Sequence, residues 1–532
     1  MFSSFRLPPL ALCLFASAST GCFDPIVASD DESDGPNDDA TETGGGNEAS
    51  TSTSTTAVDS GSEAPADSTG TEDQPPELLT FTVDGSATPP ELETSGLVLL
   101  EVDAIDDIGI DRVEFYEGKE LIASVTEAPF QHEVLLISAD NGTHPLSAIV
   151  FDTSEQSDAS DPIPLSVNIA GGAMLELRES VATISSTFGF GGVPKLTTDM
   201  SDRIVLTGRT PLDPTGDAIF TNLYDSSLSL LWGQQYAARD TSMGSVEAGY
   251  YRPSLGPSEG QIVFGGIRRP VGGETSYNIY VLDSTTGGLE TTFETRVQEE
   301  QVPVHQPVAT TPDGWLYTTV GQNQVAKFSA DFSREAWRSD GLGNVVLYLA
   351  STPGGGLVVT FQGEGCSAGE DICIRSLSSE GDTLWTRLIE PDETITTAYW
   401  GTQPSVSPNG NVAVPYSDDP VNHILLFDET GLELPTIELP EGSLPFEISY
   451  TVSNTLVVAA TDGVQQPFDT LVAHYREDGS EIWAQTFSVG SRDSGATDLA
   501  STADGRLYVT GFADSGPPSD FLTDAWLAEI RL

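Results

Sequence analysis

One short phrase of sequence recurs from about residue 196 to the C-terminus, and it limits the folds open to this chain more than any other feature. Each copy has a tight turn, a β-rich run, a variable loop, a second run, another turn and a strand that often holds a tryptophan. The clearest copies read TPDGWLYTTVG from Thr311, SPNGNVAVPYS from Ser407 and TADGRLYVTGF from Thr502. A unit that returns seven times, roughly every 40–58 residues, predicts a β-propeller with one blade per unit.

The repeat also predicts how the ring closes. Seven runs are expected to be inner strands: RIVLTG from Arg203, QIVFGG from Gln261, WLYTTV from Trp315, GLVVTF from Gly356, NVAVPY from Asn411, TLVVAA from Thr455 and RLYVTG from Arg506. The last copy reaches Leu532 without its outer strand, whereas residues 174–190 form a spare β segment before the first copy. We expect the spare strand to complete the last blade, which removes an exposed sheet edge. Seven blades are favoured, with six or eight as alternatives.

Four copies carry a tryptophan in the outer strand, and we expect each side chain to anchor neighbouring blades. These residues are Trp232, Trp337, Trp385 and Trp483.

Charge excludes one class of partner. The chain has 21 basic and 81 acidic residues, a formal net charge of -60. Nucleic acid is therefore not expected as a partner, because binding to phosphates needs clustered lysine and arginine. Electrostatic docking on anionic lipid is disfavoured for the same reason. The charge favours a soluble, self-repelling surface, and the alternative is a carboxylate-rich protein that binds Ca²⁺ outside the cell.

The N-terminus predicts export and a membrane anchor. Residues 1–21 have Arg6, an apolar run and then small residues, as in a signal peptide. Ser19 to Cys22 resembles a bacterial lipobox, which implies lipidation of Cys22, although Ser19 stands where that motif usually has leucine. Cleavage without a lipid is the alternative. Phe23 follows the cysteine, and by resemblance to enterobacterial sorting rules this permits the outer membrane or the cell surface.

Residues 22–76 predict a disordered acidic tether. They are rich in Asp, Ser, Thr and Gly, and no lysine or arginine occurs between Arg6 and Arg112. Such a segment cannot bury enough apolar surface to offset its chain entropy. A flexible chain of this length spans on the order of 40 Å, and charge repulsion extends it further.

Residues 77–169 read as short strands separated by turns, with clear alternation from Val113 to Tyr116. Asp106 to Ile110, Pro129-Phe130 and Asn141 to His144 resemble phrases of bacterial immunoglobulin-like domains, which implies a β-sandwich. Asp103, Asp106 and Asp107 cluster at a strand end, where either a Ca²⁺ site or a solvated turn is expected. His144 is expected to be structural.

Motifs for catalysis are weak. Gly256 to Gly260 matches Gly-x-Ser-x-Gly but aligns with the blade turns, so we interpret it as a turn. The repeats resemble those of secreted bacterial propellers and, more broadly, quinoprotein-like and outer-membrane assembly propellers. This chain lacks the adjacent cysteine pair of quinoprotein dehydrogenases.

Cys366 and Cys373 flank a short polar loop, which predicts a disulfide, with free thiols or a metal pair as alternatives.

The sequence thus predicts an all-β protein: a disordered tether, an immunoglobulin-like sandwich and, over residues 170–532, a seven-bladed propeller. We expect a lipid-anchored, non-catalytic binding or scaffolding protein with a protein or polysaccharide ligand. The alternatives are a hydrolase or lyase with its site at the channel mouth, and an outer-membrane assembly factor. No catalytic residue and no cofactor other than Ca²⁺ is expected. The candidate ligand contacts, for which core packing is the alternative, are Tyr250, Tyr251, His305, Tyr399 and Trp400.

Overall fold

A computed structural model of the chain describes residues 73–185, 194–198, 201–212, 216–237, 254–255, 261–268, 276–296, 307–311, 313–321, 323–329, 332–343, 345–362, 372–389, 403–418, 421–462, 469–489, 494–502, 504–513 and 522–532. The predicted signal peptide, Cys22 and all but the last few residues of the tether lie outside these ranges. Residues Thr71–Leu532 form one unit of the chain. Within the described ranges, none of the helical segments has the length and hydropathy of a membrane span.

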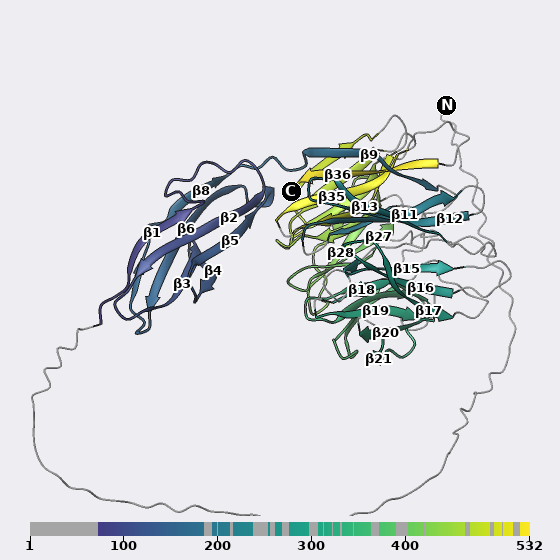
Figure 1. The fold of residues 1–532 in the computed structure, drawn as a ribbon, viewed down its shortest axis with the longest axis horizontal. Coiled ribbons are helices and arrows are strands. Elements are labelled where there is room, and N and C mark those ends of the chain that lie inside the picture. Colours follow the sequence, from purple (N-terminus) through teal and green to yellow (C-terminus); the bar gives the residue numbers. More distant parts are fainter. Residues whose placement is uncertain are drawn as a thin grey trace, which may run out of the picture. The chain divides into compact units, whose positions relative to one another are not determined.

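The first part of this unit is a β-sandwich (Figure 1). One sheet has the order β1-β2-β5 and the other has the order β4-β3-β6-β7, with β8 also paired to β6. A 3-10 turn, η1 (Ser138–Asp140), follows β5. The strands are β1 (Glu77–Val83), β2 (Gly96–Ile105), β3 (Ile110–Glu117), β4 (Glu120–Val125), β5 (Phe130–Leu136), β6 (Gly142–Asp152), β7 (Ser157–Ala159) and β8 (Ile163–Val167).

Alternate residues of these strands fill the space between the two sheets. Val113 and Phe115 on β3 are fully buried, whereas Glu114 and Tyr116 between and after them face outward. On β8, Ile163, Leu165 and Val167 alternate with exposed residues in the same way. Because side chains along a strand point to opposite faces, this period of two places one apolar row in a shared core. The predicted sandwich is confirmed.

The rest of the unit contains seven four-stranded antiparallel sheets among the described residues, each forming one blade. Blade 1 consists of β10 (Lys195–Thr198), β11 (Ile204–Leu212), β12 (Gly216–Tyr224) and β13 (Leu230–Ala237). Blade 2 consists of β14 (Ser254–Leu255), β15 (Gln261–Arg268), β16 (Ser276–Asp283) and β17 (Leu289–Arg296). Blade 3 consists of β18 (Val308–Thr310), β19 (Trp315–Val320), β20 (Gln324–Ser329) and β21 (Glu335–Arg338). Blades 4 and 5 consist of β22 (Val345–Ser351), β23 (Leu357–Gln362), β24 (Ile372–Leu377), β25 (Thr383–Ile389); and β26 (Ser405–Val406), β27 (Val412–Asp418), β28 (Val421–Phe427), β29 (Ile437–Glu438). Blades 6 and 7 consist of β30 (Leu444–Tyr450), β31 (Leu456–Asp462), β32 (Asp469–Tyr475), β33 (Glu481–Phe487); and β34 (Ser494–Ser501), β35 (Arg506–Ala513), β36 (Leu522–Arg531), β9 (Met174–Ser185).

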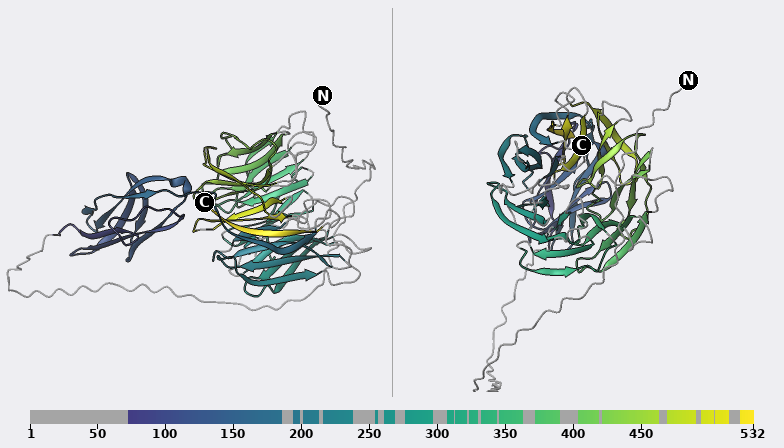
Figure 2. Two further views of the ribbon diagram at one scale, coloured as in Figure 1. Left: turned by 90° about the horizontal axis from the view of Figure 1, so that it is seen from above. Right: turned by 90° about the vertical axis from the view of Figure 1, so that its right-hand side faces the viewer.

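The blades close into a ring. Each of the seven first strands contacts the first strands of the blades on either side, so these strands surround the axis. The right-hand view of Figure 2 shows the blades following one another in sequence colours around the ring. In blade 7 the fourth strand is β9, which pairs antiparallel with β36, for example Ala528 with Leu177. The predicted completion of the last blade by the spare N-terminal strand is therefore confirmed.

One detail of the predicted blade is wrong. The seven runs expected to be inner strands are the second strands β11, β15, β19, β23, β27, β31 and β35, and a further strand precedes each of them. Several of these innermost strands are short, since β14 and β26 have two residues each and therefore leave no readable pattern. The second strands read as continuous apolar runs because both faces are covered, as in β23, where Leu357 to Phe361 are all buried.

Tryptophans of the fourth strands latch one blade to the next. The indole N–H of Trp232 donates to the carbonyl of Ser284 at 2.9 Å. Trp337 donates in the same way to Ser379 at 2.8 Å, and Trp385 to Glu429 at 3.0 Å. Each acceptor lies in the turn between the third and fourth strands of the following blade. These bonds satisfy the indole donor while its ring packs between blades, as we expected of these residues.

Candidate functional site

Most of the predicted site residues lie outside the described residues. They are Cys22, Tyr250, Tyr251, His305, Cys366, Tyr399 and Trp400. Cys373 lies on β24, is fully buried and is disulfide-bonded. Its pairing with Cys366 stays a prediction.

The three aspartates proposed to bind Ca²⁺ are not brought together. Asp106 accepts the backbone N–H groups of Ile108 at 3.0 Å and Gly109 at 2.6 Å, which closes a tight turn after β2. The bond from Gly109 is the main reason why the pKa of Asp106 lies below its usual value. Asp107 accepts instead from the backbone of Gln74, and Asp103 is exposed on β2. Over the described part of the chain, no three Asp, Glu, His or Cys side chains form a group that could hold a metal ion.

The two rims of the propeller differ. On one, which we call the turn rim, short turns join the first strand of each blade to the second and, in blades 1 to 6, the third to the fourth. The turns of the repeated phrase lie on this rim: the N–H of Gly314 donates to the carbonyl of Thr311, and the N–H of Gly410 donates to the carbonyl of Ser407. The opposite rim, which we call the loop rim, is where every first strand begins, because the seven blades share one strand order. The candidate ligand contacts immediately precede β14, β18 and β26 in the sequence.

A buried ion pair lies where the first strands of blades 1, 6 and 7 meet. The ammonium group of Lys195 on β10 lies 3.1 Å from the carboxylate of Glu447 on β30 and donates to the carbonyl of Thr497 on β34 at 2.8 Å. The Lys195 and Glu447 side chains are only 5% and 2% exposed. A charge removed from water needs a partner of opposite sign, so each of these groups depends on the other.

Asp498 on β34 joins the same three-blade contact. Its carboxylate is fully buried and accepts the backbone N–H of Leu196 and of Leu499, both at 2.8 Å. The hydroxyl of Thr497 next to it donates to the carbonyl of Pro194 at 2.7 Å. These bonds tie blade 7 to blade 1 across the point where the ring closes. The buried charges therefore hold the ring together, and sequence reasoning missed them.

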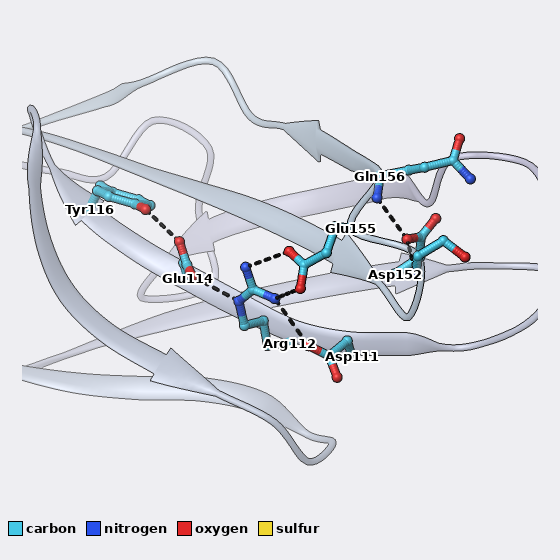
Figure 3. Close-up of polar contacts among 8 residues, drawn as sticks. Asp111, Arg112, Glu114, Tyr116, Asp152, Glu155 and Gln156 are labelled. Atoms are coloured by element: carbon cyan, nitrogen blue, oxygen red, sulfur yellow. Dashed lines mark hydrogen bonds and ion pairs between the residues drawn. The ribbon is translucent and has the colours of Figure 1, made fainter.

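A second polar network lies on the sandwich (Figure 3). The guanidinium group of Arg112 donates to both carboxylate oxygens of Glu155, at 3.2 and 3.1 Å, and to Glu114 at 2.8 Å. Its carbon lies 4.0 Å from the centre of the Phe151 ring. The hydroxyl of Tyr116 donates to Glu114, and Arg112 followed by Tyr116 lowers the pKa of that carboxyl. The network ties β3 to the turn after β6 and is structural.

Two histidines have structural partners, and for one of them, His144, the sequence predicted a structural role. Nδ1 of His144 lies 2.6 Å from Glu117, and Nε2 lies 2.5 Å from the carbonyl of Asp140. Burial lowers the pKa of His144, but these hydrogen bonds and the nearby carboxylates outweigh it, so the pKa lies above its usual value. His474 bonds to the hydroxyl of Thr455 at 2.7 Å, and burial lowers its pKa to about 3.

Comparisons with known proteins agree with the first part of the fold. Residues 80–148 match the family described as Bacterial Ig domain. This match indicates an extracytoplasmic bacterial protein. No curated protein sequence matches the chain.

Among solved structures, the chain is similar to a chain of a mitotic checkpoint complex, with a TM-score of 0.43 and 11% identity over 68% of this chain and 92% of the other. It is also similar to the WD40 repeats of RRP9, with a TM-score of 0.44 and 8% identity over 68% of this chain and all of the other. The seven sheets and their closed ring, not these similarities, establish the propeller. The architecture is consistent with a binding scaffold.

Proposed function

We propose that this protein is a cell-envelope lipoprotein that acts as a non-catalytic binding scaffold, with its ligand held on the loop rim of the propeller. One observation carries the proposal. The seven first strands begin on one rim, and the candidate aromatic and histidine contacts precede three of these strands in the sequence, which supports a ligand site on that rim. Aromatic side chains supply large contact areas with a polar edge, which suits both protein and carbohydrate ligands.

The bonding of the described charged groups supports the same proposal. Lys195, Glu447 and Asp498 bond one another or the backbone at the ring closure, and Arg112 is held by three carboxylates on the sandwich. These groups build a rigid frame. A net charge of -60 further favours a ligand that is basic or neutral, since an anionic polysaccharide would be repelled.

The anchor belongs to the proposal. A lipid on Cys22 followed by an extended acidic tether would hold the two folded domains away from the membrane. Replacement of Cys22 by serine should move the protein from the membrane fraction to the soluble fraction. Membrane retention of the Cys22→Ser protein would contradict the anchor and leave the binding proposal untouched.

The binding test uses residues 23–532 as bait against detergent-extracted cell envelope, with protease-treated and glycan-depleted extracts as parallel arms. The captured partner is then purified and titrated, with and without a Ca²⁺ chelator. We expect saturable binding that a combined Tyr399→Ala and Trp400→Ala change weakens at least tenfold. The matched control is Leu432→Ala, on the turn rim, where Leu432 is 63% exposed. Equal loss in the control, or substrate turnover without stable binding, would overturn the proposal.

A further inference from the structure

Blade 7 differs from the other six in how its outer strands are joined. In blades 1 to 6 the third and fourth strands are consecutive in the sequence, and a turn connects them. In blade 7 the third strand is β36 and the fourth is β9, which are more than 300 residues apart in the printed sequence. No turn can join these two strands directly. The indoles of Trp232, Trp337 and Trp385 each bond to such a turn in the following blade, and Trp483 of blade 6 needs an equivalent partner in blade 7.

The regular turn has a fixed bonding pattern. In blade 5, Asp428 N–H donates to the carbonyl of Leu432 at 2.9 Å, and Gly431 N–H donates back to Asp428 at 2.8 Å. Gly431 has a φ of 79°, and a Cβ there would overlap the Trp385 indole. A left-handed glycine against the ring is therefore needed at this position. Blade 4 repeats the pattern with Ser378, Gly381 and Asp382.

Two separate segments reproduce this pattern at blade 7. Arg531 N–H donates to the carbonyl of Ala173 at 2.9 Å, and Gly172 N–H donates back to Arg531 at 2.8 Å. Gly172 has a φ of 77°, and a Cβ there would lie 2.9 Å from the Trp483 ring. Arg531, Gly172 and Ala173 thus take the places of Asp428, Gly431 and Leu432. The segment that enters β9 supplies the second half of the turn.

The sandwich supplies the part that covers the indole. Trp483 donates its indole N–H to the hydroxyl of Ser138 at 3.2 Å, where the other latches use a turn carbonyl. Ser138 N–H in turn lies 3.4 Å from the carbonyl of Leu532. Ile137 is fully buried and packs in one apolar cluster with Trp483, Leu507 and Leu532. These contacts place η1 and the end of β5 on the turn rim between blades 6 and 7.

Residues of the sandwich hold η1 in this position. The Asp140 carboxylate accepts the N–H of Ile137 at 2.9 Å. The amide of Asn141 donates to the carbonyl of Ile169 at 2.9 Å and accepts its N–H at 2.6 Å, which fixes the segment leading to Gly172. The Asn-Gly-x-His phrase of the sequence therefore positions both halves of the substitute turn.

We infer that residues 135–139 and 171–173 together form the missing turn of blade 7, so that the immunoglobulin-like domain is a structural part of the propeller. The contact buries an apolar side chain and satisfies four donors, the indole N–H of Trp483 and three backbone N–H groups, which a flexible spacer would not do. The turn rim at blades 6 and 7 is thereby occupied. The two domains should consequently open together, not separately.

Amide hydrogen exchange on the whole chain tests this inference. Ile137→Asp places an unpaired charge in the cluster, and exchange at Gly172 and Arg531 should rise at least tenfold. The matched control, Leu121→Asp, changes an Ig-like residue that is 50% exposed and should leave those amides unchanged. Unchanged exchange in Ile137→Asp would overturn the inference.

A double-mutant cycle covers the case in which Ile137→Asp unfolds the sandwich. Ser138→Ala removes the acceptor and Trp483→Phe removes the donor, and neither adds volume. The shift of the propeller unfolding midpoint in the double variant should be smaller than the sum of the two single shifts, because Ser138→Ala has no indole bond left to break once Trp483→Phe has removed the donor. Additive shifts would show that the two side chains act independently and would contradict the shared turn.

Discussion

Replacement of Lys195 by methionine should destabilise the propeller strongly. The change leaves the Glu447 carboxylate 2% exposed without its 3.1 Å partner. Breaking a buried ion pair from one side costs about 3–5 kcal/mol, because the remaining charge stays out of water. The carbonyl of Thr497 also loses its 2.8 Å donor, which accounts for about 1–3 kcal/mol of that cost.

The double change Lys195→Met and Glu447→Met should recover much of the loss, since an apolar pair of similar size is often as stable as the ion pair it replaces. We expect about 1–3 kcal/mol of destabilisation to remain, from the unpaired Thr497 carbonyl. The two single changes are therefore strongly non-additive, with a coupling of about 3 kcal/mol or more.

Urea unfolding followed by tryptophan fluorescence measures these effects on the propeller, because all seven tryptophans lie at or after Trp232. The control is Arg338→Met, which removes one partner of an ion pair with Glu335 whose side chains are 40% and 35% exposed. It should cost less than about 1 kcal/mol. A cost below about 1 kcal/mol for Lys195→Met, or additive single changes, would show that the two buried charges do not depend on each other.

Three further changes test other parts of the structure. Gly431→Ala forces a side chain into a left-handed backbone against the Trp385 ring and should cost about 1–3 kcal/mol in urea unfolding. The control Gly354→Ala, where a Cβ meets nothing within 4 Å, should cost much less, and equal costs would contradict the packing of Gly431 against Trp385. The folded-state pKa of His144 lies above its unfolded value of about 6.5, so the stability that its protonation contributes is full below that pH and is lost as pH rises through the folded pKa. Calorimetry should show this fall in stability, and His144→Gln should remove the fall. Arg112→Lys cannot reproduce the two-pronged bond to Glu155 or the contact with Phe151, so the sandwich should melt at a lower temperature; an unchanged melting temperature would mean that the network is dispensable.

The sequence was sufficient to predict the sandwich, the number of blades and the closing strand, because each depends on a pattern repeated along the chain. The alternation from Val113 to Tyr116 and the turns at Gly314 and Gly410 are local signals of this kind. The innermost strands were missed, since strands of two residues such as β14 and β26 carry no period.

The non-local features could not be predicted in the same way. Ser138 and Trp483 are 345 residues apart, and nothing near either residue indicates the other. The pair of Lys195 and Glu447 joins residues 252 apart, although Lys195, as one of 21 basic residues in such an acidic chain, was a signal that could have been weighed. For the candidate site, the sequence predicted only which residues precede the first strands. The strand order that the seven blades share shows that these strands begin on one rim.

We propose that the ligand binds on the loop rim. Hydrogen exchange on residues 23–532, measured with and without the captured partner at saturation, locates the bound surface. We expect protection of the amides at the starts of β14, β18 and β26, with exchange at the turn rim unchanged. Protection confined to the turn rim, for example at Gly410 and Gly431, would show that the ligand does not bind on the loop rim.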